Sequence, residues 1–464
     1  KKKNSKRHGF TMPKKKKKAR PSKKNCTRKI KSVEETKDCL TSRAGLAPYA
    51  NFLNGTKISE TLGELLTHLR KNKKGIVLND VFFQLFLFFA DGSQQSLSAF
   101  DNLTKNESWQ KLHGCKQNLN TASLKRILAK INSADIAVLR PLLRRVFQSA
   151  LKAKNPQKVI LFLDSSVYDN DGAKCRAGVK CTYKKIQGYH PINLIWDGMY
   201  IDTHFQAGDC STNQGDVAIT MLQKVTPIIR QSLGEDIEII VRMDSGYYDQ
   251  KIFRACDELK ISFICAGKHY SDHKVLGAKH LDKFDGTYRN KGCAWRYCNF
   301  TERRSSWPQE MQYRALFLRP VEENGDALLG LDTRIILTNL KKADCSDKQI
   351  ITYDHSRGAD ELTHRAAKEF TTERMPSLDF NANAFWYTIG IIAFNLFQIF
   401  KRNVASFSWN AYPNTLRRKL FDLAGKITKH SRAFKLKITR WEMKELDFKG
   451  IWQNSLIPWL IPQV

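Results

Sequence analysis

Over residues 40–155 the apolar positions recur with the spacing of α-helices. Leucines between residues 62 and 69 return every three or four positions, so they share one helical face. Residues 81–89, VFFQLFLFF, are apolar on every side, which indicates a buried helix. Residues 121–131 and 134–151 each combine an apolar face with a basic face. The pattern therefore predicts a helical N-terminal region.

From residue 158 onward the pattern changes to short runs that are rich in β-branched residues. The first four runs are KVILFLDSSV, CTYKKIQ, INLIW and MYIDTHF. Asp197-Gly198 separates the last two and is a strong signal for a hairpin turn. A helix near 213–232, a strand ending at Asp244, another helix and another strand follow. Several antiparallel strands followed by alternating helices and strands match a ribonuclease-H-like core.

Between residues 270 and 350 the strand pattern returns, and Asn324-Gly325 marks another hairpin. Since this block separates Asp244 from the helix that carries Glu361, we interpret it as an inserted β subdomain. Residues 384–400 are almost entirely apolar but are too few to span a membrane. We expect them to form a buried helix.

Basic residues greatly outnumber acidic ones, with 78 Lys and Arg against 45 Asp and Glu and a formal net charge of +33. Residues 1–31 contain 16 of the basic residues and no acid. Such a charge attracts polyanions in a salt-dependent way, so DNA is the expected partner. The eleven cysteines form no CxxC pair, which favours reduced thiols over a zinc site. No apolar segment follows the basic N-terminus, so we expect a cytoplasmic protein without a membrane partner.

The expected fold class is α/β, with a ribonuclease-H-like core, an inserted β subdomain, a helical N-terminal domain and a helical C-terminal region. The predicted parts are a disordered basic arm (1–35), a helical DNA-binding domain (36–155), the first part of the catalytic core (156–269), the inserted β subdomain (270–350), the core segment with the Glu361 helix (351–405) and the helical C-terminal region (406–464). The basic residues of the N-terminal helices include Arg126, Lys130, Arg140, Arg144 and Arg145. A bundle with solvated basic faces is the alternative to DNA binding there. Arg417-Arg418-Lys419 forms a basic patch in the last part.

Two aspartates at the ends of predicted core strands suggest a metal site. Asp164 ends the first strand in LFLDSS, and Asp244 ends the fourth in VRMDSGYY. Each alone would be an ordinary loop residue, but neighbouring strands would bring both carboxylates together. Carboxylate oxygens are the ligands that Mg²⁺ and Mn²⁺ prefer. Two such ions about 4 Å apart activate water and neutralise the leaving oxygen in phosphodiester cleavage.

Glu361 would complete this site from a helix. Arg357, Glu361 and Lys368 stand at i, i+4 and i+11 and share one helical face, which Arg365 flanks. One interpretation is an exposed ladder of ion pairs, worth about 0.2–0.5 kcal/mol each. The other interpretation, which we adopt, places Glu361 on a metal and uses Arg357 and Lys368 to hold phosphates.

With these residues the chain resembles the DDE transposases of bacterial insertion sequences that carry a Tyr-Arg-Glu-Lys signature. In that signature two residues separate Tyr from Arg, three separate Arg from Glu and six separate Glu from Lys. Arg357, Glu361 and Lys368 keep those spacings, whereas Tyr353 lies one residue farther from the arginine. The words Asp-Ser-Gly-Tyr and Gly-Tyr-His-Pro also resemble family motifs. The resemblance covers roughly residues 120–405.

The resemblance implies an enzyme that binds the terminal inverted repeats of an insertion sequence, cleaves the DNA and transfers the 3′ ends into target DNA. It makes Asp164, Asp244 and Glu361 the catalytic residues and ligands of Mg²⁺ or Mn²⁺. It also implies a homodimer on paired ends, on the nucleoid of a bacterial cell. Tyr353, Arg357, Arg365 and Lys368 would bind the DNA.

The same family resemblance suggests three further residues that would act on or near the DNA. Trp295 and Trp307 in the insert would stack on a flipped base, with a role in the hydrophobic core as the alternative. His190, in Gly-Tyr-His-Pro, would have an accessory role near the site. Two other functions stay open: a related nuclease without strand transfer, and a degenerate transposase that only binds DNA. All three acidic positions are intact, which argues against the second.

Overall fold

The computed structural model describes residues 30, 32–70, 75–268, 283–290, 292–322, 333–406, 412–431 and 433–462. The chain divides into residues 1–38 and residues 39–464, and the description below concerns the second unit. Most of the predicted basic arm lies outside the described residues, as do the Asn324-Gly325 turn and part of the predicted insert.

The centre of the unit is a mixed sheet in which a five-strand part has the order β7-β6-β2-β8-β9. β2 pairs antiparallel with β6 and parallel with β8, while β9 continues parallel to β8. Asp197 and Gly198 both have positive φ, as the predicted hairpin turn between β6 and β7 requires. The strands are β2 (Lys158–Ser165), β6 (Ile192–Trp196), β7 (Met199–His204), β8 (Glu238–Met243) and β9 (Ser262–Ala266).

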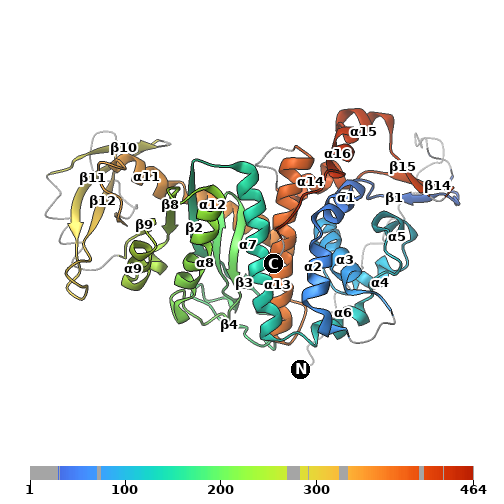
Figure 1. Ribbon diagram of the computed structural model, residues 1–464, viewed down its shortest axis with the longest axis horizontal. Coiled ribbons are helices and arrows are strands. Elements are labelled where there is room, and N and C mark those ends of the chain that lie inside the picture. The colour runs from blue at the N-terminus through green and yellow to red at the C-terminus, as the bar shows by residue number, and fades with distance from the viewer. Residues whose placement is uncertain are drawn as a thin grey trace, which may run out of the picture. The chain divides into compact units, whose positions relative to one another are not determined.

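The predicted insert is not a separate sheet. Its strands extend the central sheet to nine strands, because β13 pairs antiparallel with β9 and β12, β11 and β10 follow in order (Figure 1). They are β10 (Gly286–Asn290), β11 (Cys293–Glu302), β12 (Tyr313–Val321) and β13 (Arg334–Thr338). The division into an inserted β subdomain stays a prediction, and the continuation of its strands into the central sheet could not be predicted because strand pattern alone does not indicate which strands pair. Residues of the described insert form a small hydrophobic cluster with Ile240 of β8 and Ile264 of β9, which α11 (Asp347–His355) joins through Ile350 and Ile351.

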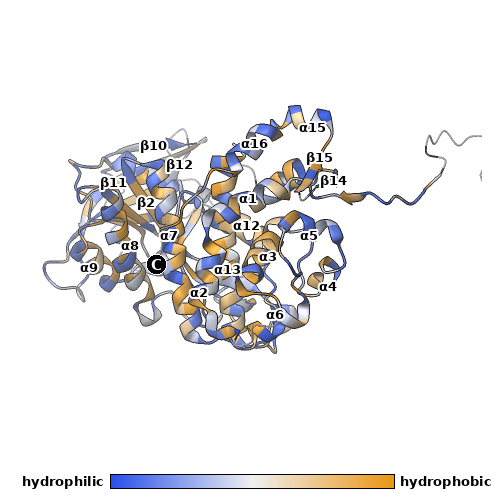
Figure 2. Cartoon of the chain, turned by 45° about the vertical axis from the view of Figure 1, so that its right-hand side comes forward, coloured by the Kyte–Doolittle hydropathy of each residue, from blue (hydrophilic) through white to orange (hydrophobic). Residues whose placement is uncertain are grey.

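Long helices pack against the central strands. They are α7 (Ser133–Lys154), α8 (Val217–Leu233), α9 (Gln250–Glu258), α12 (Arg357–Thr371) and α13 (Phe380–Ile399). α13 contains the predicted buried helix, and its contacts with α3, α7, α12 and β7 confirm that prediction. With its continuation to Val404 it is long and apolar enough to cross a membrane, yet its apolar stretch is completely buried among the surrounding elements (Figure 2).

Helices dominate the predicted N-terminal region, as expected. They are α1 (Leu46–Thr56), α2 (Ile58–Leu65), α3 (Leu78–Asp91), α4 (Ala99–Leu103), α5 (Glu107–His113) and α6 (Thr121–Leu128). α7, however, packs on β7 and α13 rather than only on these helices. Its Arg140 and Arg144 bind the buried Asp202 of β7, with N···O distances of 2.7 and 2.6 Å. Neither arginine is therefore part of a solvated basic face.

The C-terminal region is not purely helical. Its elements are a π-helical turn η6 (Phe400–Val404), α14 (Pro413–Leu416), a second π-helical turn η7 (Arg417–Phe421), β14 (Gly425–His430), β15 (Ala433–Lys437), α15 (Arg440–Glu445) and α16 (Phe448–Ser455). β14 pairs with both β15 and β1 (Cys39–Thr41), which forms a second sheet. The prediction of a basic surface patch was wrong for Arg417, which is 5% exposed. Its guanidinium donates to the carbonyl oxygens of Phe89 and Ala90 at the end of α3.

Candidate functional site

The sheet register brings the two predicted aspartates side by side. Leu163 of β2 is paired with Met243 of the parallel β8. Asp164 directly follows Leu163, and Asp244 directly follows Met243. Asp244 caps a short 3₁₀ turn, η5 (Ser245–Tyr247), by accepting from the Gly246 N–H at 2.9 Å. A Cβ at Gly246 would lie 2.9 Å from Oδ1 of Asp244, so this close approach favours glycine.

α12 supplies the third carboxylate from a helix that faces these strand ends. Its residues Arg357, Glu361, His364, Arg365 and Lys368 all line one cavity of about 560 Å³. Asp164 and Asp244 line the same cavity. The structure therefore brings together all three predicted carboxylates and three of the four predicted DNA-binding residues of this segment.

A third, small sheet contributes another basic residue to the cavity. It contains β3 (Tyr168–Asp169), β4 (Lys180–Cys181) and β5 (Gln187–Tyr189). The predicted strand CTYKKIQ is largely the turn between β4 and β5. That turn places Tyr183, which is 63% exposed, and Lys184 at the cavity. Neither residue was a candidate, and the Lys184-Lys185 pair beside an aromatic residue was the available signal.

Burial and mutual repulsion make the acidic side of the cavity a favourable place for a cation. Burial raises the pKa of Asp244 above its usual value, and the negative charge of Asp164 raises it further. Arg357 and the backbone N–H groups of η5 act in the opposite direction. A divalent cation between the carboxylates would relieve this repulsion.

The donor set also fits such a cation chemically. Within the described ranges, no three His, Cys, Asp or Glu side chains approach closely enough to ligate one ion together. Mg²⁺ commonly takes only one or two carboxylates, with water and substrate phosphate completing its shell. Asp164, Asp244 and Glu361 provide hard oxygen atoms for that arrangement, and their shared cavity leaves room for the phosphate.

Arg242 ties the strand of Asp244 to the helix of Glu361. Its guanidinium donates to Asp360, to the hydroxyl of Ser356 at 2.5 Å and to the carbonyl oxygen of Tyr353 at 3.1 Å. The side chains of Arg242 and Asp360 are 8% and 15% exposed, so this is a largely buried ion pair. Because Arg242 precedes Asp244 by two residues and Asp360 precedes Glu361 by one, the pair fixes the distance between β8 and α12. Sequence analysis missed it, since nothing local distinguishes Arg242.

His364 is a second residue that sequence analysis missed. Its Nε2 atom lies 3.3 Å from Oδ2 of Asp164, and its Nδ1 atom lies 2.9 Å from the Tyr200 hydroxyl. The signal was present, because a histidine three residues after Glu361 shares its helical face. Tyr200 had no such signal, since it lies far away on β7.

The two cationic candidates of α12 are anchored at the cavity by different contacts. Lys368 pairs with Glu373 at 2.5 Å and donates to the carbonyl oxygen of Val167. Arg357 donates to the carbonyl oxygen of Met243 at 3.4 Å and lies 3.4 Å from Asp354. Both side chains line the cavity, so the predicted helical stripe is not an isolated ladder of surface ion pairs.

Two predicted residues lie beside the cavity rather than on its wall. Tyr353 belongs to α11, and the helix break at Ser356 separates it from Arg357; its hydroxyl accepts from Lys158 at 3.2 Å. His190 lies behind Asp164, with Nε2 2.8 Å from the Ser165 hydroxyl and Nδ1 3.0 Å from the Cys210 carbonyl oxygen. Burial lowers its pKa.

The two tryptophans lie in packed regions. Trp295 and Trp307 are each 7% exposed. Trp295 packs edge-on against His355, and Trp307 packs against Tyr248 and Phe253. This environment favours the alternative of core tryptophans, and stacking on a flipped base stays a prediction.

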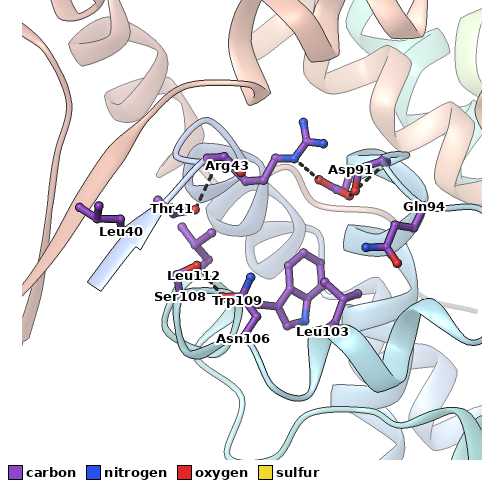
Figure 3. Close-up of a pocket in the computed structure, with 12 residues that line it drawn as sticks. Leu40, Thr41, Arg43, Asp91, Gln94, Leu103, Asn106, Ser108, Trp109 and Leu112 are labelled. Carbon is purple, nitrogen blue, oxygen red and sulfur yellow. Dashed lines mark hydrogen bonds and ion pairs between the residues drawn. The ribbon is translucent and has the colours of Figure 1, made fainter. Parts of the chain in front are cut away.

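A second cavity, of about 270 Å³, lies among β1, α5 and the end of α3 (Figure 3). It also contains a buried carboxylate, that of Asp91. Here, however, the guanidinium of Arg43 lies 3.0 Å from the carboxylate and compensates its charge. Arg43 also binds Asp422, so this cavity marks a structural joint between the N- and C-terminal segments.

Two strand-end aspartates and a helical glutamate thus line one cavity together with several basic side chains. The family model for transposase DDE domain group 1 matches residues 24–449. The chain therefore belongs to the transposase DDE domain family, whose members cleave and join DNA. A search of the curated proteins found no match. Among solved structures, the chain is similar to the piggyBac transposase in a cryo-EM synaptic complex with hairpin DNA, at 11% identity and a TM-score of 0.41, over 91% of this chain and 86% of that chain.

Proposed function

We propose that this protein is the transposase of a bacterial insertion sequence, which binds the terminal inverted repeats, cleaves the DNA and transfers its 3′ ends into a target. The observation that carries the proposal is the shared cavity of Asp164, Asp244 and Glu361. The match to the DDE family model covers all three residues, which supports assigning them to catalysis. The strand order β7-β6-β2-β8-β9 supports a ribonuclease-H-like core.

Asp164, Asp244 and Glu361 would hold Mg²⁺ or Mn²⁺. Bound there, the ions would supply Lewis-acid activation of water or a 3′-hydroxyl and would stabilise the leaving oxygen. The chain's own contribution is to hold three carboxylates on rigid elements. β2 and β8 are internal strands, and the Arg242–Asp360 pair keeps α12 opposite them.

The basic wall of the cavity would position the DNA backbone. Lys184, Arg357, Arg365 and Lys368 line the same cavity as the carboxylates. Arginine binds phosphate through two parallel hydrogen bonds, and lysine adds a point charge. Holding the scissile phosphate in line with the carboxylates removes much of the entropic part of the barrier. Since two element ends must be processed together, we propose a homodimer on paired ends, acting on the bacterial nucleoid.

The proposal is tested with the full-length protein and Mg²⁺. One DNA substrate carries the inverted repeats that flank the gene, and a second carries the same ends with scrambled sequence; a supercoiled plasmid serves as target. Cleavage at the repeats together with joined products supports a transposase. Cleavage without joining supports the nuclease alternative, and binding of the repeats without cleavage supports a degenerate DNA-binding protein.

Carboxylate variants provide the matched controls. Asp164→Asn, Asp244→Asn and Glu361→Gln should abolish cleavage while preserving binding of the repeats in a gel-shift assay. Each substitution removes a metal ligand and leaves the basic wall unchanged. Loss of repeat binding by a variant that keeps its fold would instead make that carboxylate a structural or DNA-contacting residue.

A further inference from the structure

His364 connects the wall of the cavity to the interior of the protein. It lines the cavity but is only 7% exposed. One ring nitrogen faces the Asp164 carboxylate and the other faces Tyr200, which is 1% exposed on β7. The rings of Phe162 and Tyr200 lie near the imidazole, with centroids 6.4 and 5.8 Å away. Packing therefore limits the orientations that the imidazole can adopt.

The Tyr200 hydroxyl occupies the Nδ1 side of His364 and leaves the Nε2 side to face Asp164. Burial raises the pKa of Tyr200 well above its usual value, so the phenol keeps its proton and can donate it in a hydrogen bond. When Nδ1 of the neutral imidazole accepts that hydrogen bond, Nε2 carries the ring hydrogen and faces the carboxylate as a donor.

The Nε2 atom of His364 is buried and lies close to a carboxylate oxygen. Within the described part of the chain it makes no hydrogen bond of full geometry, and the nearest carboxylate oxygen, Oδ2 of Asp164, lies 3.3 Å away. Leaving a buried polar group unsatisfied is unfavourable. This separation is within hydrogen-bond distance, so a small rotation of the imidazole or of the carboxylate would complete the bond. The structure therefore keeps Nε2 close to Oδ2, while the Ser165 N–H binds Oδ1 at 2.8 Å.

We propose that His364 is a positioning residue that fixes the Asp164 carboxylate as a metal ligand, and that Tyr200 fixes His364. The proposal rests on the proposed function, since it concerns the same metal site. Asp244 does not need such a partner, because it is already held as the cap of η5. Groups that orient metal ligands in this way typically change metal affinity or activity by about 10- to 100-fold when they are removed.

The experiment compares His364→Leu, His364→Gln and Tyr200→Phe with the wild-type protein. Leu removes the donor, Gln retains an N–H donor of similar reach, and Phe removes only the hydroxyl that orients the ring. Tyr387→Phe is the matched control, because its buried hydroxyl binds Asn193 and Thr203 in the same core instead of His364. Two quantities are measured: the Mg²⁺ concentration for half-maximal cleavage, and Fe²⁺-promoted backbone cutting next to Asp164 and Asp244 without DNA.

We expect His364→Leu to raise the half-maximal Mg²⁺ concentration about 10- to 100-fold. Tyr200→Phe should raise it by a smaller factor, His364→Gln should restore part of the loss, and Tyr387→Phe should leave it unchanged. Iron-promoted cutting at Asp164 should weaken in the same order. Unchanged Mg²⁺ dependence and unchanged cutting in His364→Leu and Tyr200→Phe would overturn the proposal, even if both variants lose thermal stability.

The proposal and the function on which it rests can fail separately. If the wild-type protein does not cleave DNA yet shows iron-promoted cutting at Asp164, the proposed function fails, and the effect of His364 on cutting still tests the positioning role. If His364→Leu does not fold, Tyr200→Phe and His364→Gln decide the outcome by the same two measurements.

Discussion

Lys368 reaches the cavity from the C-terminal half of α12, where Glu373 and the Val167 carbonyl oxygen hold its ammonium group. We expect Lys368→Ala to reduce cleavage about 10- to 100-fold, because a hydrogen bond to a charged group contributes about 1.5–3 kcal/mol. Formation of the protein–DNA end complex should fall with it, while iron-promoted cutting at Asp164 should persist.

Glu373→Gln provides the control for this prediction. It removes the ion-pair partner but leaves the ammonium group in place, so cleavage should change much less than in Lys368→Ala. Wild-type cleavage rates in Lys368→Ala would show that this lysine stabilises α12 and the neighbouring loop without contacting the substrate.

The raised pKa of Asp244 has a consequence for stability. A carboxyl group whose pKa is higher in the folded than in the unfolded state binds its proton more tightly when folded. Its contribution to stability therefore falls as pH rises through the two pKa values. We expect Asp244→Asn to raise the Tm of the metal-free protein by roughly 1–3 °C at neutral pH. The difference should vanish in acid and should reverse when Mg²⁺ is added, as scanning calorimetry at several pH values would reveal; an equal or lower Tm for the metal-free variant at pH 7 contradicts this.

At the scale of elements, the Arg242–Asp360 pair joins β8 to α12. Arg242→Met should destabilise the protein by about 3–5 kcal/mol, because it leaves Asp360 largely buried without its partner. Arg242→Met combined with Asp360→Leu should recover most of this loss in thermal or urea denaturation. Cleavage should remain impaired in the double variant, because α12 is no longer tied to the strand of Asp244.

The Lys174–Asp171 pair is a suitable comparison, since its side chains are 64% and 60% exposed. Lys174→Met should change stability by less than about 1 kcal/mol. If the double variant at Arg242 and Asp360 were as unstable as Arg242→Met alone, the guanidinium would stabilise the fold through its bonds to Ser356 and Tyr353 instead.

The core strands and the buried helix were predictable because each has a local pattern. β2 and β8 are short, mainly apolar runs that end at polar residues, and α13 is predominantly apolar. Pairing between distant segments has no such pattern. The connection of the insert through β13 and β9, and the strands β14 and β15, were therefore missed. β15 alternates lysine with apolar residues, as a strand does. It forms a sheet only together with β14 and with β1, which comes from the other end of the unit.

The same distinction applies to the site. The shared cavity of Asp164, Asp244 and Glu361 was predictable because each residue stands in a recognisable word, while their catalytic role stays a prediction. His364 and Arg242 act through Tyr200 and Asp360, and the fold alone brings these partners together. Tyr353 kept its place in the signature by sequence, yet the break between α11 and α12 gives it a different environment from that of Arg357.

At the scale of the whole molecule, the net charge of +33 should dominate non-specific binding. Deleting residues 1–31, which carry 16 basic side chains, should weaken binding to every DNA sequence and flatten its salt dependence. Each lost phosphate contact lowers the slope of log K against log salt by about 0.9. Fluorescence anisotropy with repeat and scrambled DNA at several salt concentrations measures both effects, and a loss confined to repeat DNA would assign sequence recognition to this segment.

The pairing of β1 with β14 determines when the protein can finish folding. β1 is among the first residues of its unit to leave the ribosome, whereas β14 is among the last. Until β14 emerges, β1 has no strand partner, and Arg43 and Asp91 lack the segment that carries Asp422. All the residues that line the acidic cavity are translated before β14 can pair with β1. A message truncated after α13 would therefore yield all three carboxylates on a chain with an open edge, prone to association with other unfinished chains.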